Sequence, residues 1–376
     1  MSEYEAFLAY LGHLARFGMR LGLERMEALL ERLGHPERRA GVVHVAGTNG
    51  KGSTAAMIAA IARAAGLRTG LYTSPHLVRF NERIAVDGEP IGDEALLEAY
   101  RAVQAAVEAL GAAEPPTQFE FATAMAFWVF AQAGVELAVV EVGLGGRLDA
   151  TNVVRRPEVC VVTSLGLDHT QVLGGTLAAI AAEKAGILKP GADAVVASPP
   201  PEAAPVIQER AQELGAPLFE VGEGAPVMAG AQLYRWSGRC EGLSGGRLDV
   251  ATPEGRRLEG LRVALAGRHQ LLNGAVAAAC ADRLRARGWP TGPDSVARGL
   301  EQVRWPGRFH VLRQHPTVVV DGAHNPAAAR ALELAEPDDV VAVCGSLYLA
   351  GEILAESAPA EARTVSKAAG IRRPAP

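Results

Sequence analysis

The segment from residue 42 to residue 65 constrains the fold of this chain more than any other. A short β-branched run, Val42–Val45, precedes the glycine-rich stretch Gly47–Ser53, and an alanine-rich segment of helical pattern, Thr54–Ala65, follows it. Small residues between a strand and a helix let main-chain N–H groups surround a phosphate, whose negative charge the helix dipole favours. This order of elements therefore predicts an α/β domain that binds phosphate.

The residues of this loop indicate a nucleoside triphosphate. Lys51 is placed to reach the β- and γ-phosphates, and the hydroxyl of Ser53 or Thr54 to help hold Mg²⁺. The strict pattern G-x-x-x-x-G-K-[ST] is not met, because Gly52 separates the lysine from the hydroxyl. An ordinary glycine-rich turn is the alternative, against which the flanking strand and helix argue. The predicted ATP-binding loop consists of Gly47, Thr48, Asn49, Gly50, Lys51, Gly52, Ser53 and Thr54.

The rest of the chain predicts a doubly wound, mostly parallel sheet. Short apolar runs typical of buried strands alternate with longer segments of helical spacing. Two helices are expected within Glu3–Leu33, and the alternating segment Gln232–Ala266 predicts a β-rich lobe. The expected strands are Gly70–Tyr72, Leu137–Val142, Val159–Thr163 and Ala194–Ala197, and the expected helices Asp93–Leu110, Phe119–Ala133, Thr176–Ile187 and Asn273–Arg287.

The pattern also predicts two domains. Trp289–Asp294 carries two prolines and a glycine, which is typical of a domain boundary, and a strand pattern restarts at Val318–Val320. We therefore expect an ATP-binding catalytic domain over residues 1–290 and a small α/β domain over residues 296–376.

The composition excludes several classes of protein. Hydrophobic residues make up 49% of the 376 residues and charged residues 21%, as in globular chains. A net charge of -5 with scattered arginines argues against nucleic acid or an anionic membrane as a partner. The start of the chain lacks a basic signal segment, and the apolar stretch Phe121–Ala131 is too short to cross a bilayer, so we expect a cytosolic protein. We also expect a monomer. The four cysteines lack a CxxC pair and are expected to be small core residues.

Polar residues follow two of the predicted strands. Glu141 ends one strand before the glycine-rich run Gly143–Asp149, and His169 follows the next strand along the chain. Ligands of open α/β sheets bind at the carboxyl ends of the strands. We expect these two strands to be neighbours in the sheet, so that the two side chains share one Mg²⁺ ion. A hydrogen-bonded loop residue is the alternative for His169, because Mg²⁺ prefers oxygen. Lys184 lies in a predicted helix, where a solvated charge is the alternative to a place in this site.

Short motifs occur in a characteristic order along about residues 8–350. They are His44–Ser53, Thr73–Leu77, Asn81–Ile84, Glu141–Asn152, Ser164–His169, Glu183–Ile187, His269-Gln270 with Asn273, Trp305–Arg308 and Asp321–Pro326. In order and spacing they resemble the signatures of the folylpolyglutamate synthase and dihydrofolate synthase family, a branch of the Mur ligase superfamily. The resemblance implies an ATP-dependent ligase that adds L-glutamate to a folate or dihydropteroate carboxylate through an acyl phosphate.

The resemblance also implies roles for individual residues. Ser74, Glu141 and His169 match its Mg²⁺ site, and Lys184 matches a lysine that is often carbamylated in this superfamily. Lys51, His169 and Lys184 are therefore the catalytic candidates. The residues implied to contact the nucleotide outside the loop are Asn273 and Arg308 at the phosphates, and Asp321 and His324 near the ribose and base.

A pterin-binding wall is implied by the loop Thr73–Arg83 together with Thr117–Glu120. Phe80 or Phe119 is expected to stack on the planar ring, with core packing as the alternative for each. The candidate substrate-binding residues are Pro75, His76, Phe80, Arg83, Gln118 and Phe119.

The sequence departs from the family after Asp321–Pro326. The run Gly345–Glu352 follows soon after, where family members have several more strands and helices. We therefore expect a shortened second domain. Two other functions stay open: a Mur-type ligase for another substrate, and a nucleotide-binding regulator that has lost ligase activity.

Overall fold

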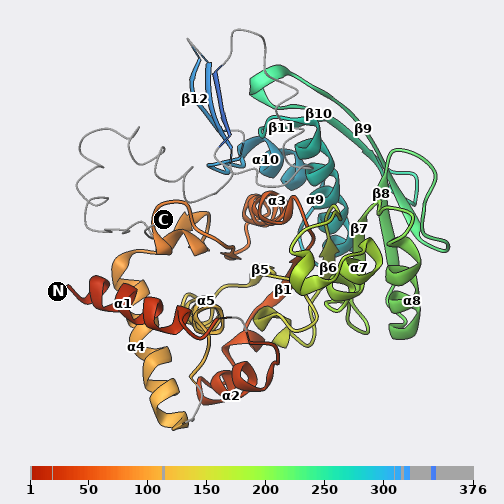
Figure 1. The fold of residues 1–376 in the computed structure, drawn as a ribbon. Helices are drawn as coiled ribbons and strands as arrows, with labels where there is room; N and C mark the ends of the chain where they lie inside the picture. Colours follow the sequence, from red (N-terminus) through yellow and green to blue (C-terminus); the bar gives the residue numbers. More distant parts are fainter. Residues whose placement is uncertain are drawn as a thin grey trace.

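The computed structural model describes residues 2–18, 20–111, 115–308, 310–314, 317–321 and 340–343 (Figure 1). Its centre is an eleven-stranded sheet with the order β11-β10-β9-β8-β7-β6-β1-β5-β2-β3-β4. The strands are β1 (Gly41–Ala46), β2 (Thr69–Tyr72), β3 (Ile84–Val86), β4 (Glu89–Pro90), β5 (Leu137–Glu141), β6 (Val159–Val162), β7 (Asp193–Ala197), β8 (Leu218–Gly222), β9 (Gln232–Cys240), β10 (Gly246–Ala251) and β11 (Arg257–Val263).

The central strands are parallel, as predicted. β1 pairs in parallel with β5 and with β6, and parallel pairing continues outward from β5 to β2 and from β6 through β7 and β8 to β9. Antiparallel strands β3, β4, β10 and β11 complete the two edges. The predicted β-rich lobe is therefore a continuation of the main sheet.

Helices cover both faces of the sheet (Figure 1). One face packs against α3, α9 and α10, and the other against α1, α2, α4, α5, α7 and α8. Strand β1 shows the alternation that this requires, because Val43 and Val45 belong to the core under α3 whereas Val42 belongs to the core under α5. The helices are α1 (Glu3–Ala15), α2 (Glu24–Arg32), α3 (Lys51–Ala64), α4 (Asp93–Leu110), α5 (Gln118–Gln132), α6 (Thr170–Leu173), α7 (Leu177–Ala185), α8 (Ala204–Leu214), α9 (Arg268–Ala286) and α10 (Pro293–Gln302).

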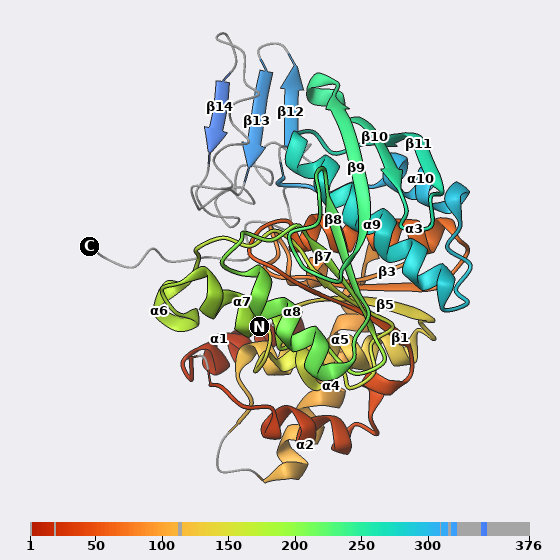
Figure 2. The ribbon, with the colours of Figure 1, turned by 90° about the vertical axis from the view of Figure 1, so that its right-hand side faces the viewer.

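Three further strands form a separate small sheet. They are β12 (His310–Gln314), β13 (Thr317–Asp321) and β14 (Val340–Val343), and they lie side by side in Figure 2. β13 contains the predicted strand Val318–Val320 and pairs in parallel with β14. The run Gly345–Glu352, on which we based the shortened second domain, lies outside the described residues.

The segment between the two sheets bears on the domain boundary. The predicted start of the second domain, residue 296, falls inside α10, and α10 packs on α3 so closely that Gly299 faces the backbone of Ile61. Helix α10 therefore packs with the elements of the large sheet. The chain passes from the large sheet to the small one over residues 303–308. The division into domains 1–290 and 296–376 itself stays a prediction. Among the described helices, none combines the length and apolar character needed to cross a membrane.

Candidate active site

The phosphate loop connects β1 to α3 at the carboxyl end of the sheet. Gly47 and Gly50 have φ angles of 149° and 86°, a region that favours glycine. A Cβ atom at Gly47 would overlap the hydroxyl of Thr163, and one at Gly50 would overlap the amide of Asn273. Both positions therefore require glycine for two reasons, backbone conformation and lack of space.

The end of β6 holds this loop in place. The Thr163 hydroxyl donates to the carbonyl of Asn49 at 2.8 Å, and the N–H groups of Thr48 and Asn49 both donate to the carbonyl of Ser164, at 2.9 and 3.2 Å. The loop is thus fixed from the neighbouring strand before any ligand is present.

Two lysines converge on the carbonyl oxygen of Gly47. The Nζ of Lys51 donates to it at 3.0 Å and to the carbonyl of Thr48 at 3.2 Å, while the Nζ of Lys184 donates to it at 2.8 Å. Burial lowers the pKa of both ammonium groups, and burial together with the charge of Lys51 brings the pKa of Lys184 to about 7. Lys184 is only 4% exposed, so the solvated helix charge considered above is wrong.

Glu141 lies at the end of β5 and is only 5% exposed. Its Oε2 atom accepts a hydrogen bond from the main-chain N–H of Ser74 at 3.1 Å, so the structure brings these two predicted metal ligands together. Burial raises the pKa of the carboxyl group, and the nearby charge of Lys51 opposes that rise.

The position of His169 corrects one step of the sequence interpretation. β5 and β6 are not adjacent, because β1 lies between them and is hydrogen-bonded to both. Glu141 and His169 therefore lie on either side of the phosphate loop. The side chain of His169 is 55% exposed, and its Nε2 is 3.8 Å from Asp168 Oδ1.

Most of the predicted nucleotide and metal residues line one pocket of about 210 Å³, which we call the phosphate pocket. Thr54 does not line it, because its side chain is fully buried, with a hydroxyl that has no protein partner. His324 lies outside the described residues. The predicted residues that line the phosphate pocket are Gly47, Thr48, Asn49, Gly50, Lys51, Gly52, Ser53, Ser74, Pro75, Glu141, His169, Lys184, Asn273, Arg308 and Asp321.

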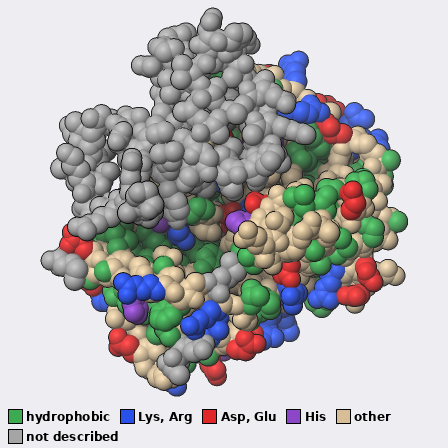
Figure 3. Space-filling model, viewed as in Figure 1, with side chains coloured by type: hydrophobic (Ala, Val, Ile, Leu, Met, Phe, Trp, Pro, Cys, Tyr) green, Lys and Arg blue, Asp and Glu red, His purple; other side chains and the backbone are tan. Residues whose placement is uncertain are grey.

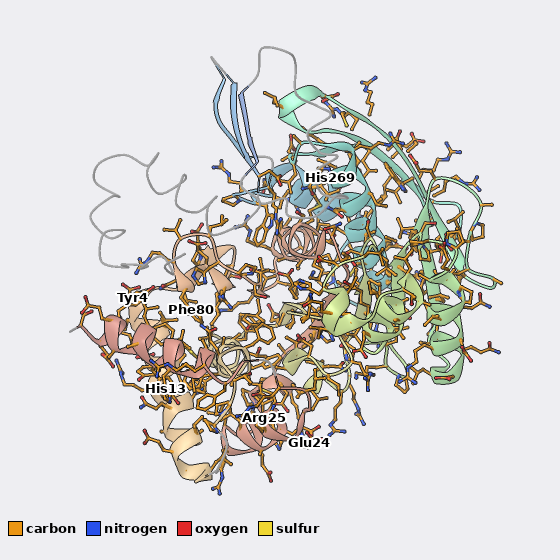
Figure 4. The ribbon with its side chains drawn as sticks, in the orientation of Figure 1. Tyr4, His13, Glu24, Arg25, Phe80 and His269 are labelled. Carbon is orange, nitrogen blue, oxygen red and sulfur yellow. The ribbon has the colours of Figure 1, made fainter. Side chains whose placement is uncertain are left out.

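Several residues that line the phosphate pocket were not among the predicted site residues, and they include Asp168, His269 and Gln270. Gln270 accepts from Asn273 Nδ2 at 3.0 Å and lies 3.3 Å from the hydroxyl of Ser53. Figure 4 places His269 at the start of α9, and its pKa is lowered by burial and by the charge of Arg308. All three residues belong to motifs that the sequence already offered, His269-Gln270 and Ser164–His169, and those motifs could have indicated them as site residues.

A second pocket, of about 550 Å³, lies on the α5 side of the sheet and is called here the α5 pocket. Pro75, Arg83, Gln118 and Phe119 line it, as expected of the substrate wall. Phe80 does not: it is 2% exposed and packs edge-to-face on Phe7 at 5.0 Å, beside α1 (Figure 4). For Phe80 the alternative of core packing therefore applies.

A third pocket, of about 680 Å³, lies on the α3 side and is called the α3 pocket. His76 lines it and accepts a hydrogen bond at Nδ1 from Arg83 Nε at 2.8 Å. Burial and the Arg83 charge lower the pKa of His76 to about 4. The face drawn in Figure 3 is hollowed, with hydrophobic side chains next to histidine and basic ones.

Ser74 and Pro75 line the phosphate, α3 and α5 pockets alike. A molecule in either side pocket can therefore place a reactive group against the phosphate loop. This arrangement suits a transfer from a nucleotide phosphate to a second substrate.

Comparison with known proteins identifies the family. The Mur ligase middle domain model matches residues 45–281. The chain is 40% identical over 328 residues to a dihydrofolate synthase/folylpolyglutamate synthase of Bacillus subtilis, an alignment that covers 86% of this chain and 74% of that protein. The chain belongs to the folylpolyglutamate synthase and dihydrofolate synthase family of Mur ligases.

Solved structures of the family agree with the fold. The apo form of the L. casei folylpolyglutamate synthase matches with a TM-score of 0.84 at 33% identity, over 94% of this chain and 98% of that one. A complex of a folylpolyglutamate synthase with AMPPCP and folate matches with a TM-score of 0.79 at 38% identity, over 88% and 79%. The predictions of an α/β Mur ligase fold and of an ATP-dependent ligase are confirmed.

Proposed function

We propose that this enzyme attaches L-glutamate to the carboxylate of a folate or of dihydropteroate and couples the step to cleavage of ATP. One observation carries the proposal: the phosphate pocket, with Lys51 and Lys184 at its loop, meets two side pockets at the dipeptide Ser74-Pro75. Relatives named for both activities, with a solved complex that contains an ATP analogue and folate, support this choice of substrates.

The first step is attack of a substrate carboxylate oxygen on the γ-phosphorus of ATP. A new P–O bond forms, the bond to the leaving ADP oxygen breaks, and an acyl phosphate results. Lys51 and the loop N–H groups neutralise the charge that builds on the transferring group. Arg308, which also lines the phosphate pocket, adds a second fixed positive charge.

The second step is attack of the glutamate amine on the acyl carbon. The tetrahedral intermediate expels phosphate, the nitrogen loses one proton, and an amide remains. Water would hydrolyse the acyl phosphate, so the reaction needs a site from which water is largely excluded. Glu141, Asn273 and Asp321 line the phosphate pocket and are each no more than 6% exposed, which supports such a site.

The residues present fit a Mg²⁺ ion. Glu141 offers a buried carboxylate whose charged form burial disfavours, so a divalent cation there would relieve an unfavourable state. Glu141 and Ser74 would hold the ion, with His169 on the other side of the phosphate loop. When bound, the ion supplies positive charge to the phosphate oxygens.

Lys184 is proposed to carry a carbamate. With a pKa of about 7, a large share of its amine is neutral at physiological pH. The nitrogen can then form a bond to the carbon of CO₂ and release one proton to solvent, which leaves an anionic carbamate as an oxygen donor. With ¹³C-labelled bicarbonate, we expect a carbamate signal in the ¹³C NMR spectrum of the wild type and none in Lys184→Arg. An identical spectrum from both proteins would contradict the modification.

The α5 pocket is proposed to receive the pterin ring. Phe119 is half-buried, lies across Gly143 and presents its ring to the pocket, and Gln118 and Arg83 add polar groups. The same pocket contains Asp149, a buried carboxylate fixed by Thr151 and by the N–H of Leu144.

The deciding experiment is a steady-state assay of ADP formation with dihydropteroate and with tetrahydrofolate in turn. We expect ADP only when an acceptor, glutamate and ATP are all present, together with a product one glutamate longer. ADP formation with a peptide precursor linked to a nucleotide would favour another Mur-type ligase. Nucleotide binding without turnover would favour a regulator.

Three further expectations stay predictions: a cytosolic location, a monomeric state, and the absence of a nucleic-acid partner. Sedimentation of the full chain with and without ATP would test the second.

A further inference from the structure

The loop from Ser74 to Arg79 separates the three pockets, yet it has no regular secondary structure. Four of its main-chain N–H groups donate instead to two carboxylates. The N–H of Ser74 donates to Glu141, and those of Leu77, Val78 and Arg79 donate to Glu82. The shape of the loop therefore depends on side chains rather than on a ladder or a helix.

Glu82 receives three successive N–H groups with good geometry. Its Oε2 accepts from Leu77 at 2.7 Å, and its Oε1 accepts from Val78 at 3.0 Å and from Arg79 at 2.7 Å. Hydrogen bonds to an ionised acceptor are about twice as strong as neutral ones. A carboxylate accepts hydrogen bonds at two oxygens, whereas the amide of glutamine has one oxygen and an NH₂ group that only donates. Glutamine at position 82 therefore cannot accept all three bonds.

The support under Glu82 is itself fixed. Glu82 lies in the 3₁₀ helix η2 (Phe80–Arg83), whose Asn81 donates through Nδ2 to the carbonyl of Ile91 and to Asp93, both at 2.9 Å. The Tyr4 hydroxyl donates to Asn81 Oδ1 at 3.2 Å. The carboxylate therefore joins the loop to a rigid base formed by α1 and α4.

We propose that Glu82 is a positioning residue for the ligase reaction, which holds Ser74–Leu77 in the shape that receives the acceptor substrate. The inference rests on the proposed function. Glu82 also borders the α3 pocket, but both of its carboxylate oxygens accept these main-chain N–H groups, and it has no role in the chemical steps above. Without it, the three N–H groups turn to water and the walls that Pro75, His76 and Leu77 give to the side pockets move.

Hydrogen exchange of the unaltered enzyme gives the first test. The amides of residues 77–79 should exchange slowly although they lie in an irregular loop. Exchange as fast as that of Gly88, in the turn between β3 and β4, would overturn the proposal without any variant.

Glu82→Gln gives the second test, with Glu136→Gln as the matched control. Glu136 also accepts a main-chain N–H, that of Arg68 at 2.8 Å, but next to the start of β5, at the opposite end of the sheet. We expect Glu82→Gln to lose protection at residues 77–79 and to raise the KM for the acceptor at least about tenfold, because a small displacement near the reacting group has a large effect. The KM for ATP and the melting temperature should match those of Glu136→Gln.

The outcomes separate this inference from the proposed function. If the wild type forms no ADP with either acceptor, the proposed function fails. If the wild type is active and Glu82→Gln has the acceptor KM of the control, the positioning role fails. Equal loss of acceptor affinity, ATP affinity and melting temperature in Glu82→Gln would also overturn it, because that pattern indicates general loosening.

Discussion

Lys51 and Lys184 share one carbonyl oxygen, that of Gly47, at the entrance of α3. Burial lowers the pKa of both ammonium groups, and the charge of Lys51 lowers the pKa of Lys184 further. At Lys51, the carboxylate of Glu141 opposes this lowering of the pKa. A triphosphate would supply much more negative charge at the same place, so these residues are arranged for a ligand that carries it.

Replacing Lys51 by alanine should lower ligase turnover about 100- to 1000-fold, the usual effect of removing one group that stabilises transition-state charge. The melting temperature should change little, because the hydrogen bonds of Lys51 lie within its own loop. Steady-state ADP formation measures the effect. Lys189→Ala, which alters a lysine outside the described pockets, is the control, and near-normal turnover in Lys51→Ala would refute the assigned role.

His44 gives a prediction about stability and pH. It is fully buried on β1, its Nε2 lies 2.8 Å from the Thr151 hydroxyl, and burial lowers its pKa to about 3. The unfolded chain binds the proton near pH 6.5, so the stability contributed by neutral His44 is complete above that pH and is lost as the pH falls toward 3. Between pH 7 and pH 5 the free energy of unfolding should fall by about 2 kcal/mol from this residue alone.

The measurement is urea unfolding of the wild type and of His44→Gln at pH 7 and pH 5. Glutamine can still donate to Thr151 but does not titrate. The variant should therefore lose about 2 kcal/mol less than the wild type over this interval. An equal loss in both proteins would show that His44 is not buried as a neutral group.

At the scale of elements, α10 packs directly against α3. A Cβ atom at Gly299 would lie 2.5 Å from the Cα and 2.6 Å from the N atom of Ile61, so the two helices meet backbone to backbone. This contact attaches α10 to the large sheet although the preceding segment has the composition of a boundary. The linker after α10 then carries Arg308 into the phosphate pocket.

Gly299→Ala should therefore destabilise the protein by about 1–3 kcal/mol, the usual result of overpacking. Gly12→Ala is the matched control, because Gly12 lies in α1 with no atom within 4 Å of the added methyl group. That change should be neutral or stabilise by up to about 1 kcal/mol through helix propensity. Urea unfolding compares the two, and equal midpoints would contradict the close contact of α10 with α3.

At the scale of the whole molecule, three pockets meet at one point of the sheet. The α5 and α3 pockets lie on opposite faces, and the phosphate pocket lies at the carboxyl edge between them. All three share Ser74 and Pro75. We propose that nucleotide and acceptor occupy different pockets, and their affinities should then respond separately to substitution.

Phe119→Ala tests this separation. The ring lines the α5 pocket but not the phosphate pocket, so the KM for the acceptor should rise about tenfold or more while the KM for ATP stays within about twofold. Trp128→Phe, on the same helix and outside both pockets, is the control. A parallel rise in both KM values would mean that the substitution loosens the whole site.

Local pattern was enough to predict the phosphate loop, the parallel strands and the covering helices. Glycines with a lysine between a β-branched run and an alanine-rich helix describe one strand–loop–helix unit, and short apolar runs that alternate with longer helical patterns indicate the buried strands. For the same reason Glu141 could be placed at the end of β5, since a strand's carboxyl end is visible in the sequence.

Which residues meet across the fold was decided only by the tertiary structure. Strand order placed β1 between β5 and β6, so that Glu141 and His169 flank the phosphate loop, and packing turned Phe80 into the core while Phe119 stayed at a pocket. The three bonds of Glu82 likewise depend on how the loop folds back on η2. Sequence determines which faces are apolar and where the chain turns, whereas side-chain neighbours depend on long-range pairing and close packing that no local pattern encodes.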